Sequence, residues 1–211
     1  MRFWLRVTPV VLVGFLATVA SGQIDPANSD VFNTVHNLDN LPGISVPLNQ
    51  VCLPCHVPHY ADPYDEIDPL DPVILWNHDQ PDLAFTMYTT LNDVTPGQPE
   101  GPSKMCLGCH DGVTAMDNYG GTTGGTEVMV GSRAIGQNQD LSDDHPIGIT
   151  YPDGNPSYNL STTLLGVQVV TIDGVDRVEC TSCHEPHNNS LGRFLRRELS
   201  ESQICLECHI K

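Results

Sequence analysis

Apolar residues occur along this chain as one long run near the start and as short groups after it. The run Val7–Ala20 (VTPVVLVGFLATVA) follows the basic start MRFWLR and precedes the small residues Ser21 and Gly22. A basic start, an apolar stretch of this length and small residues after it are typical of a secretory signal peptide. We therefore expect residues 1–22 to be a signal peptide cleaved after Gly22, and residues 23–211 to form a single domain.

An uncleaved membrane anchor is the alternative interpretation of the same run. A spanning helix needs about 20 predominantly apolar residues, whereas small residues rather than further apolar ones follow Ala20. The rest of the sequence contains no other run that is long and apolar enough to span a bilayer. We therefore expect no stable membrane insertion after signal cleavage.

Beyond the signal, glycine and proline interrupt the pattern throughout. The sequence has 18 Gly and 17 Pro, a content that disfavours long helices and a wide sheet. Two β-favouring runs flank Asp173-Gly174, a dipeptide typical of a two-residue hairpin turn. Ser200 and Gln203 have the spacing of a capping box and predict a short helix that carries Cys205–His209. The pattern predicts a mostly irregular fold with short helices and a minor β-hairpin.

The charge of the chain excludes some partners. The formal net charge is −17, and it becomes −19 once Arg2 and Arg6 leave with the signal. Such a chain repels nucleic acid and anionic lipid, so we expect neither as a partner. The acidity is densest in Asp62–Pro72 (DPYDEIDPLDP), whose spacing matches no calcium-binding loop, and we interpret this segment as a solvated loop.

All eight cysteines fall into C-x-x-C pairs that are each followed at once by histidine. An exported chain with eight cysteines could form four disulfides, but a disulfide framework has no use for that histidine. Zinc sites also use C-x-x-C spacing, yet zinc does not require a histidine directly after each second cysteine. The four segments are Cys52–His56 (CLPCH), Cys106–His110 (CLGCH), Cys180–His184 (CTSCH) and Cys205–His209 (CLECH).

C-x-x-C-H is the attachment signature of c-type haem. Two thiols add to the two vinyl groups of the porphyrin, and the adjacent histidine then binds the iron axially. We therefore predict four covalently attached haems, which would form the core of the domain because their apolar faces need burial. The predicted attachment residues are Cys52, Cys55, Cys106, Cys109, Cys180, Cys183, Cys205 and Cys208, and the proximal ligands are His56, His110, His184 and His209.

Five further histidines are candidates for the sixth position on the four irons: His36, His59, His78, His145 and His187. Methionine is the rival ligand and raises the potential. However, Met105 immediately precedes Cys106 and Met116 follows closely after His110, so neither has an obvious route to a distal face.

Bis-histidine ligation with low potentials is therefore the prediction. Iron with six ligands has no open position for a substrate, which argues against catalysis at the metal, so we expect no enzyme.

Two of the motifs place a second histidine three residues after the proximal one. His59 is too near His56, and His187 too near His184, to reach the opposite face of the same porphyrin. Each is therefore predicted to ligate a different haem. This arrangement would tie haems together in pairs and keep them close enough for electrons to tunnel between them.

The order of the motifs resembles a known family. The segments VHNL, CLPCHVPH, ILWNH, FTMY, CLGCHDG, DHPIGITYP, VECTSCHEPH, FLR and CLECHIK together resemble the OmcE-type tetrahaem cytochromes, outer-surface proteins that polymerise into extracellular nanowire filaments. The resemblance runs from about residue 35 to the C-terminus. It implies a multihaem cytochrome c fold around a continuous chain of stacked bis-histidine haems, with His78 and His145 as ligands, and subunits joined end to end.

Three functions remain in competition at this stage. The first is an electron-conducting filament subunit, secreted to the extracellular space or cell surface, with itself and other redox proteins or extracellular acceptors as partners. The second is a soluble monomeric tetrahaem shuttle in the periplasm, and the third is a membrane-anchored tetrahaem quinol dehydrogenase. For a filament, we also predict that a neighbouring subunit supplies one distal ligand, with His36 as the first choice of donor and His78 and His145 next. The alternative is that all four haems are completed within one chain.

Overall fold

The computed structural model of the chain describes residues 31–57, 75–89 and 96–210. The predicted signal peptide, the acidic segment 62–72 and His59 lie outside the described residues. Most of the described chain is turn, bend or irregular structure, as the glycine and proline content predicts.

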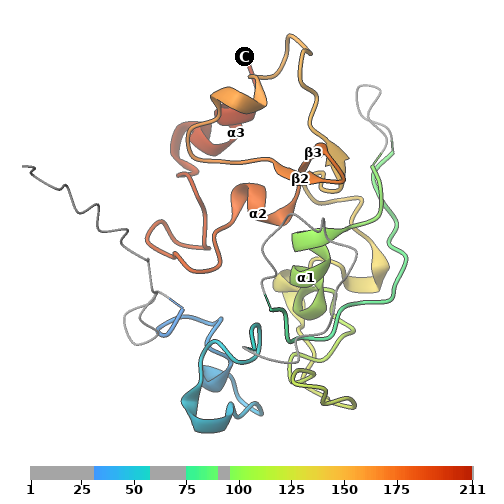
Figure 1. Cartoon of the computed structure of the whole chain (residues 1–211), viewed down its shortest axis with the longest axis vertical. Helices are drawn as coiled ribbons and strands as arrows, with labels where there is room; N and C mark the ends of the chain where they lie inside the picture. Colours follow the sequence, from blue (N-terminus) through green and yellow to red (C-terminus); the bar gives the residue numbers. More distant parts are fainter. Residues whose placement is uncertain (1–30, 58–74, 90–95, 211) are drawn as a thin grey trace, which may run out of the picture.

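Three short α-helices coincide with three of the cysteine motifs (Figure 1). They are α1 (Gly101–His110), α2 (Cys180–Cys183) and α3 (Gln203–Cys208). Pro102 stands in the first turn of α1, where a proline costs no hydrogen bond. Among the described residues no helix combines the length and the apolar character needed to cross a bilayer. The 3-10 turns of the described chain are Leu38–Asn40, Pro47–Asn49, Gly131–Arg133, Gln137–Gln139, Ser161–Thr163 and Ser200–Ser202.

The predicted hairpin is confirmed. Strands β2 (Val170–Ile172) and β3 (Val175–Val178) pair antiparallel with Ile172 opposite Val175. The loop residues Asp173 and Gly174 both have positive φ, 53° and 73°, as a type I′ turn requires. A third strand, β1 (Ile149–Thr150), pairs antiparallel with β3 and was not predicted; the sheet order is β1-β3-β2.

The predicted helix at the last motif is present, but its predicted capping box is wrong. The helix α3 begins at Gln203, and the residue before it, Ser202, has a left-handed conformation with no side-chain cap. Ser200 instead belongs to the preceding 3-10 turn, and its hydroxyl donates to the Glu198 carboxylate at 2.7 Å. The tight turn before α3 therefore takes the place of the cap.

Side-chain packing provides only small apolar clusters in the described residues. One cluster is formed by Leu38, Ile44 and Val46 in the N-terminal segment. The other is formed by Phe85, Leu107 and Leu141 around the buried face of α1. Neither cluster gathers the three cysteine-bearing helices into one common core.

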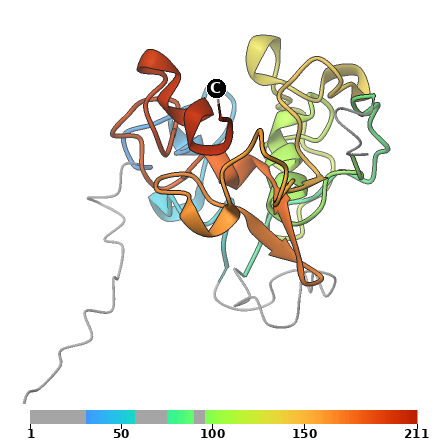
Figure 2. The same cartoon turned by 90° about the horizontal axis from the view of Figure 1, so that it is seen from above.

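The motifs are spread along the long axis of the molecule. In Figure 1 the described N-terminal segment lies at one end of this axis, α3 lies at the other end, and α1 and α2 lie between them. Figure 2, seen from above, places α1 and α3 on opposite sides of the molecule. The first and last motifs are therefore far apart, with the second and third between them.

Candidate haem-binding sites

Each cysteine motif forms about one helical turn. The His56 N–H donates to the Cys52 carbonyl at 2.8 Å, and His184 and His209 donate to the first cysteine of their own motifs at 3.0 and 2.9 Å. His110 is the last residue of α1. Residues three apart on a helix lie on the same face, so this turn presents both thiols of a motif on one side. That is the arrangement in which two thiols can reach one porphyrin.

None of the eight cysteines forms a disulfide. Among the described residues, no three His, Cys, Asp or Glu side chains converge closely enough to hold a metal ion. A structural zinc site needs four converging ligands.

The second and third motifs adjoin each other directly. The Cys106 and Cys180 thiols lie close together, and their interaction lowers the pKa of Cys180 and raises that of Cys106. The Cys180 N–H donates to the Ser103 hydroxyl at 2.9 Å, and Ser103 is fully buried in α1. These contacts fix the start of α2 against α1, so two attachment cysteines of different motifs lie side by side.

The first motif lies near the second, and the third lies near the last. Burial raises the pKa of the Cys109 thiol, and the nearby Cys55 thiol of the first motif raises it further. Burial also raises the pKa of Cys183 to about 11, with Cys208 of the last motif adding to the effect. The four motifs therefore follow one another in space as they do in the sequence.

Three of the predicted proximal histidines each face a predicted distal histidine. A metal–imidazole bond is about 2 Å long, so two imidazoles bound to opposite sides of one metal have ring centroids about 6 Å apart. The observed centroid separations are 6.1 Å for His56 and His187, 6.4 Å for His36 and His110, and 6.5 Å for His145 and His209. These separations fit the insertion of an iron between the rings.

The pair of His56 and His187 involves both motifs in which a second histidine follows the proximal one by three residues. His187 lies three residues after the proximal His184, yet its ring is paired with His56 of another motif. This is the geometry that ligation of a different haem requires. The corresponding histidine of the first motif, His59, lies outside the described residues.

Most of the described histidine rings are oriented through Nδ1. A metal-bound histidine usually donates its other ring N–H to a carbonyl or carboxylate, which fixes the tautomer and leaves Nε2 for the metal. The Nδ1 partners are the Asp79 carbonyl for His78 (2.8 Å), the Arg133 carbonyl for His110 (2.7 Å), the Pro146 carbonyl for His145 (3.1 Å), the Arg193 carbonyl for His184 (3.0 Å) and the Glu185 carboxylate for His187 (3.1 Å).

The pair His36 and His110 lines a large cavity. Its volume is about 1030 Å³, at the upper end of the range of about 300–1,000 Å³ typical of ligand pockets. The His36 ring stacks on Phe194 with centroids 4.1 Å apart. Burial, with the charge of His110, lowers the pKa of His36 to about 4, so its imidazole is neutral and able to bind a metal at neutral pH. The residues present therefore fit a haem held between the two rings.

This position of His36 bears on its predicted role as a donor to a neighbouring subunit. His36 lies against His110 and Phe194 of its own chain, which favours ligation within the chain. Ligation in trans by any histidine stays a prediction.

His78 is placed differently from the other distal candidates. Its side chain is buried, with 2% of its surface exposed. Its Nε2 lies 3.4 Å from Cys109 Sγ and 3.2 Å from the Met116 carbonyl oxygen. The structure thus brings His78 to the second motif but pairs its ring with no proximal histidine in the described residues.

Three of the methionines have packing roles. Met116 packs against the cluster around Leu38, and Met87 against the cluster around Phe85. Met105 is buried within α1. Packing of these side chains in apolar surroundings favours a structural role over ligation.

Two residues inside or beside the second motif were missed by the sequence reasoning. A Cβ added at Gly108 would collide with the Asp79 carbonyl and come within 3.2 Å of His78 Nδ1, so the closeness of the His78 segment requires glycine there. Asp111 is fully buried and accepts hydrogen bonds from the backbone of Val113 and Thr114. The string C-L-G-C-H-D-G contained the signal, since glycine and aspartate often mark close approaches and turns.

Glu179 was also missed, and it precedes the third motif. It is 1% exposed, and its backbone N–H donates to Ser182 Oγ at 2.9 Å. Burial raises the pKa of its carboxyl to about 7, opposed by Ser103 and Arg177. A carboxyl whose pKa is raised by burial therefore lies beside Cys180.

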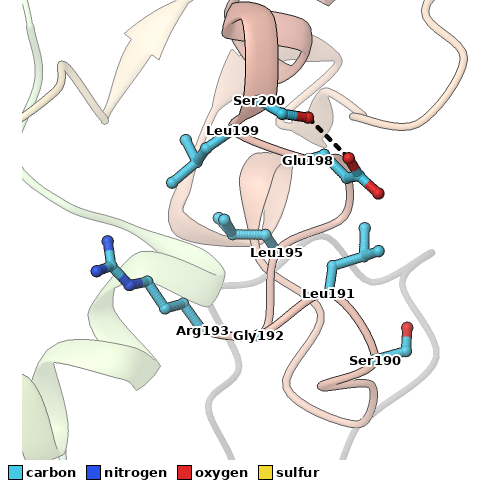
Figure 3. Close-up of a pocket in the computed structure, with 8 residues that line it drawn as sticks. All are labelled: Ser190, Leu191, Gly192, Arg193, Leu195, Glu198, Leu199 and Ser200. Carbon is cyan, nitrogen blue, oxygen red and sulfur yellow. Dashed lines mark hydrogen bonds between the residues drawn. The ribbon is translucent and has the colours of Figure 1, made fainter.

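A smaller cavity of about 440 Å³ lies in the segment before α3 (Figure 3). Its lining contains no histidine or cysteine, and the Glu198 carboxylate in it accepts a hydrogen bond from Ser200.

Comparison with known proteins covers the last two motifs. Residues 174–211 match the model of the doubled CXXCH motif family. The search of curated proteins gave no significant match. The paired motifs indicate covalently attached c-type haem and a role in electron transfer, which fits a secreted or periplasmic protein.

Proposed function

We propose that this protein is a tetrahaem c-type cytochrome that carries electrons along four closely spaced bis-histidine haems. The observation that carries the proposal is the spatial order of the motifs: α2 is fixed against α1 by the hydrogen bond from Cys180 to Ser103, and the first and last motifs lie on either side of these helices along the long axis (Figure 1). Haems attached in this order would form one continuous path. The small apolar clusters leave the haems themselves to supply most of the core.

The histidine pairs suggest a complete ligand set within one chain. If His187 serves the haem of His56, the matching position in the first motif, His59, is suited to serve the haem of His184. The other two pairs are His36 with His110 and His145 with His209. On this assignment His78 is the histidine left over, and its burial makes it a poor donor to another subunit.

We propose further that the protein is the subunit of an extracellular electron-conducting filament. The resemblance to OmcE-type cytochromes motivates this step. The position of the first and last motifs toward opposite ends of the long axis supports it (Figure 1). Cys205 and His209 are exposed at the far end, so a haem there would be open to a redox partner or to another copy of the chain. With every iron saturated, the protein would have no catalytic site.

Electron microscopy of the secreted fraction tests the filament. Ordered filaments that contain this chain would support it, and a uniformly monomeric haem protein in the periplasm would replace it with the electron shuttle. N-terminal sequencing of the purified protein tests the anchor, since a chain that starts at Gln23 has no membrane segment left.

The absence of catalysis is tested by assaying nitrite and sulfite reduction with a strong reductant. We expect only slow, non-saturable oxidation of the haems. Saturable turnover at an appreciable rate would contradict six-coordinate iron at every site.

A further inference from the structure

Cations are scarce in this acidic chain, and most of the described ones already have partners. Three arginines form ion pairs: Arg177 with Glu100 at 3.2 Å, Arg196 with Glu185 at 3.0 Å and Arg197 with Glu207 at 2.9 Å. Lys104 also has an interaction of its own. The other two arginines, Arg133 and Arg193, form no ion pair with any described carboxylate.

These two arginines meet at one place. Arg133 ends the 3-10 turn Gly131–Arg133 and Arg193 lies 60 positions later, yet both line the cavity of about 1030 Å³ that contains His36 and His110. Both side chains are exposed. In Figure 3 the Arg193 guanidinium points away from the nearby Glu198 carboxylate.

The backbone of the same two residues already serves the haem ligands. The Arg133 carbonyl accepts the hydrogen bond from His110 Nδ1, and the Arg193 carbonyl accepts the one from His184 Nδ1. Each arginine is therefore held at a fixed place relative to a proximal imidazole. For Arg133 this imidazole is the proximal ligand of the haem at Cys106 and Cys109, whereas Arg193 reaches the same haem site through its place in the cavity lining.

We propose that Arg133 and Arg193 bind the propionate groups of the haem attached at Cys106 and Cys109. This inference rests on the proposed function, because it requires a haem between His36 and His110. A haem carries two propionate carboxylates, and the planar guanidinium binds a carboxylate through paired hydrogen bonds. Two unpaired arginines on one cavity therefore match the two carboxylates that a haem would bring into it.

Because the rest of the chain is negatively charged, the pairing of arginine with propionate affects the reduction potential of the haem. At a net charge of −17, an uncompensated propionate would add to the negative field around the iron. That field disfavours the electron that reduction adds. Arg133 and Arg193 act here as positioning residues that also raise the potential of this haem above the value it would have without them.

The test is a spectroelectrochemical titration of the full-length holoprotein with Arg133→Gln and Arg193→Gln. Each variant should keep four haems by intact mass and keep them all low-spin. One midpoint potential should move to a more negative value, by about tenfold in the reduction equilibrium constant, or about 59 mV for a one-electron couple. Lys104→Gln is the matched control: it removes one cation from α1 outside the cavity lining and should shift the potentials much less.

Three results would overturn the inference while leaving the proposed function intact. They are four haems with unchanged potentials in both glutamine variants, a shift as large in Lys104→Gln, and a change confined to a haem whose ligands are not His36 and His110. The acidic segment 62–72 is the rival partner for the arginines, and unchanged potentials would point to it.

Lysine variants keep the test decisive if a glutamine variant loses a haem. Arg133→Lys and Arg193→Lys retain the charge, so they should assemble with four haems and potentials nearer the wild-type values. The same loss of haem in the lysine variants would show that the loss does not follow from the missing positive charge, and it would overturn the inference. Wild-type protein without haem would instead refute the proposed function itself.

Discussion

Replacing His187 by alanine should open the sixth position of the haem at Cys52 and Cys55, although His187 is close in sequence to the third motif. The reason is spatial. The His187 ring faces His56 with centroids 6.1 Å apart, while His184, three residues earlier, is oriented by the Arg193 carbonyl. The variant should still carry four haems.

The size and character of the change follow from the geometry. One of four haems is affected, so about a quarter of the low-spin signal should be replaced by a high-spin signal. The His56 and His187 planes are inclined by only 24°, whereas the planes of the other two pairs are inclined by 78° and 81°. Nearly parallel imidazoles give a rhombic ferric signal and nearly perpendicular ones a strongly axial signal. The lost component should therefore be rhombic.

Low-temperature electron paramagnetic resonance of the oxidised protein measures both quantities. His145→Ala is the comparison, because it should remove an axial component of the same size. His78→Ala is the control, because it lies outside the three pairs and should leave every haem low-spin. Four low-spin haems in His187→Ala, or the loss of an axial component there, would refute the assigned pairing.

Other substitutions test the supports around the second and third motifs. Gly108→Ala should destabilise the folded protein by about 1–3 kcal/mol in denaturant titrations, because the added methyl overpacks the His78 segment; an unchanged midpoint would show that the segment yields freely. Ser103→Ala should cost about 1–3 kcal/mol in the same titration, because it leaves the Cys180 N–H without its partner, and a neutral effect would mean that another acceptor replaces the hydroxyl. Because the folded chain holds the Glu179 proton more tightly than the unfolded chain does, stability should fall as the pH rises from 4.5 to about 7. Glu179→Gln should remove that fall and be more stable at pH 8 by on the order of 1–3 kcal/mol; equal pH dependence in both proteins would contradict the buried carboxyl.

The chemistry of the sites could be predicted from the sequence because it resides in local strings. A C-x-x-C-H segment contains its two thiols and its imidazole within five residues, so no tertiary information is needed to recognise it. The Asp173-Gly174 turn is local in the same way, since positive φ at both positions is a property of those residues. The confirmed hairpin and the short helices at the motifs belong to this class.

Features that depend on long-range contacts could not be predicted. The strand β1 pairs with β3 across 29 residues, from Ile149 to Val178. It is too short to leave a hydrophobic pattern. The pairing of His187 with His56 spans 131 residues; the sequence indicated only that His187 must serve another haem, not which one. The Ser200 capping box failed because α3 begins only at Gln203, so Ser200 lies in the preceding 3-10 turn, where its hydroxyl donates to Glu198.

We predict that one chain carries four covalently attached haems. The intact mass of the mature, denatured protein tests this most directly, because thioether-bound haem stays on the chain when the iron ligands are lost. The expected mass is that of the chain plus four haem groups. A mass with fewer than four haems, or with none, would contradict it.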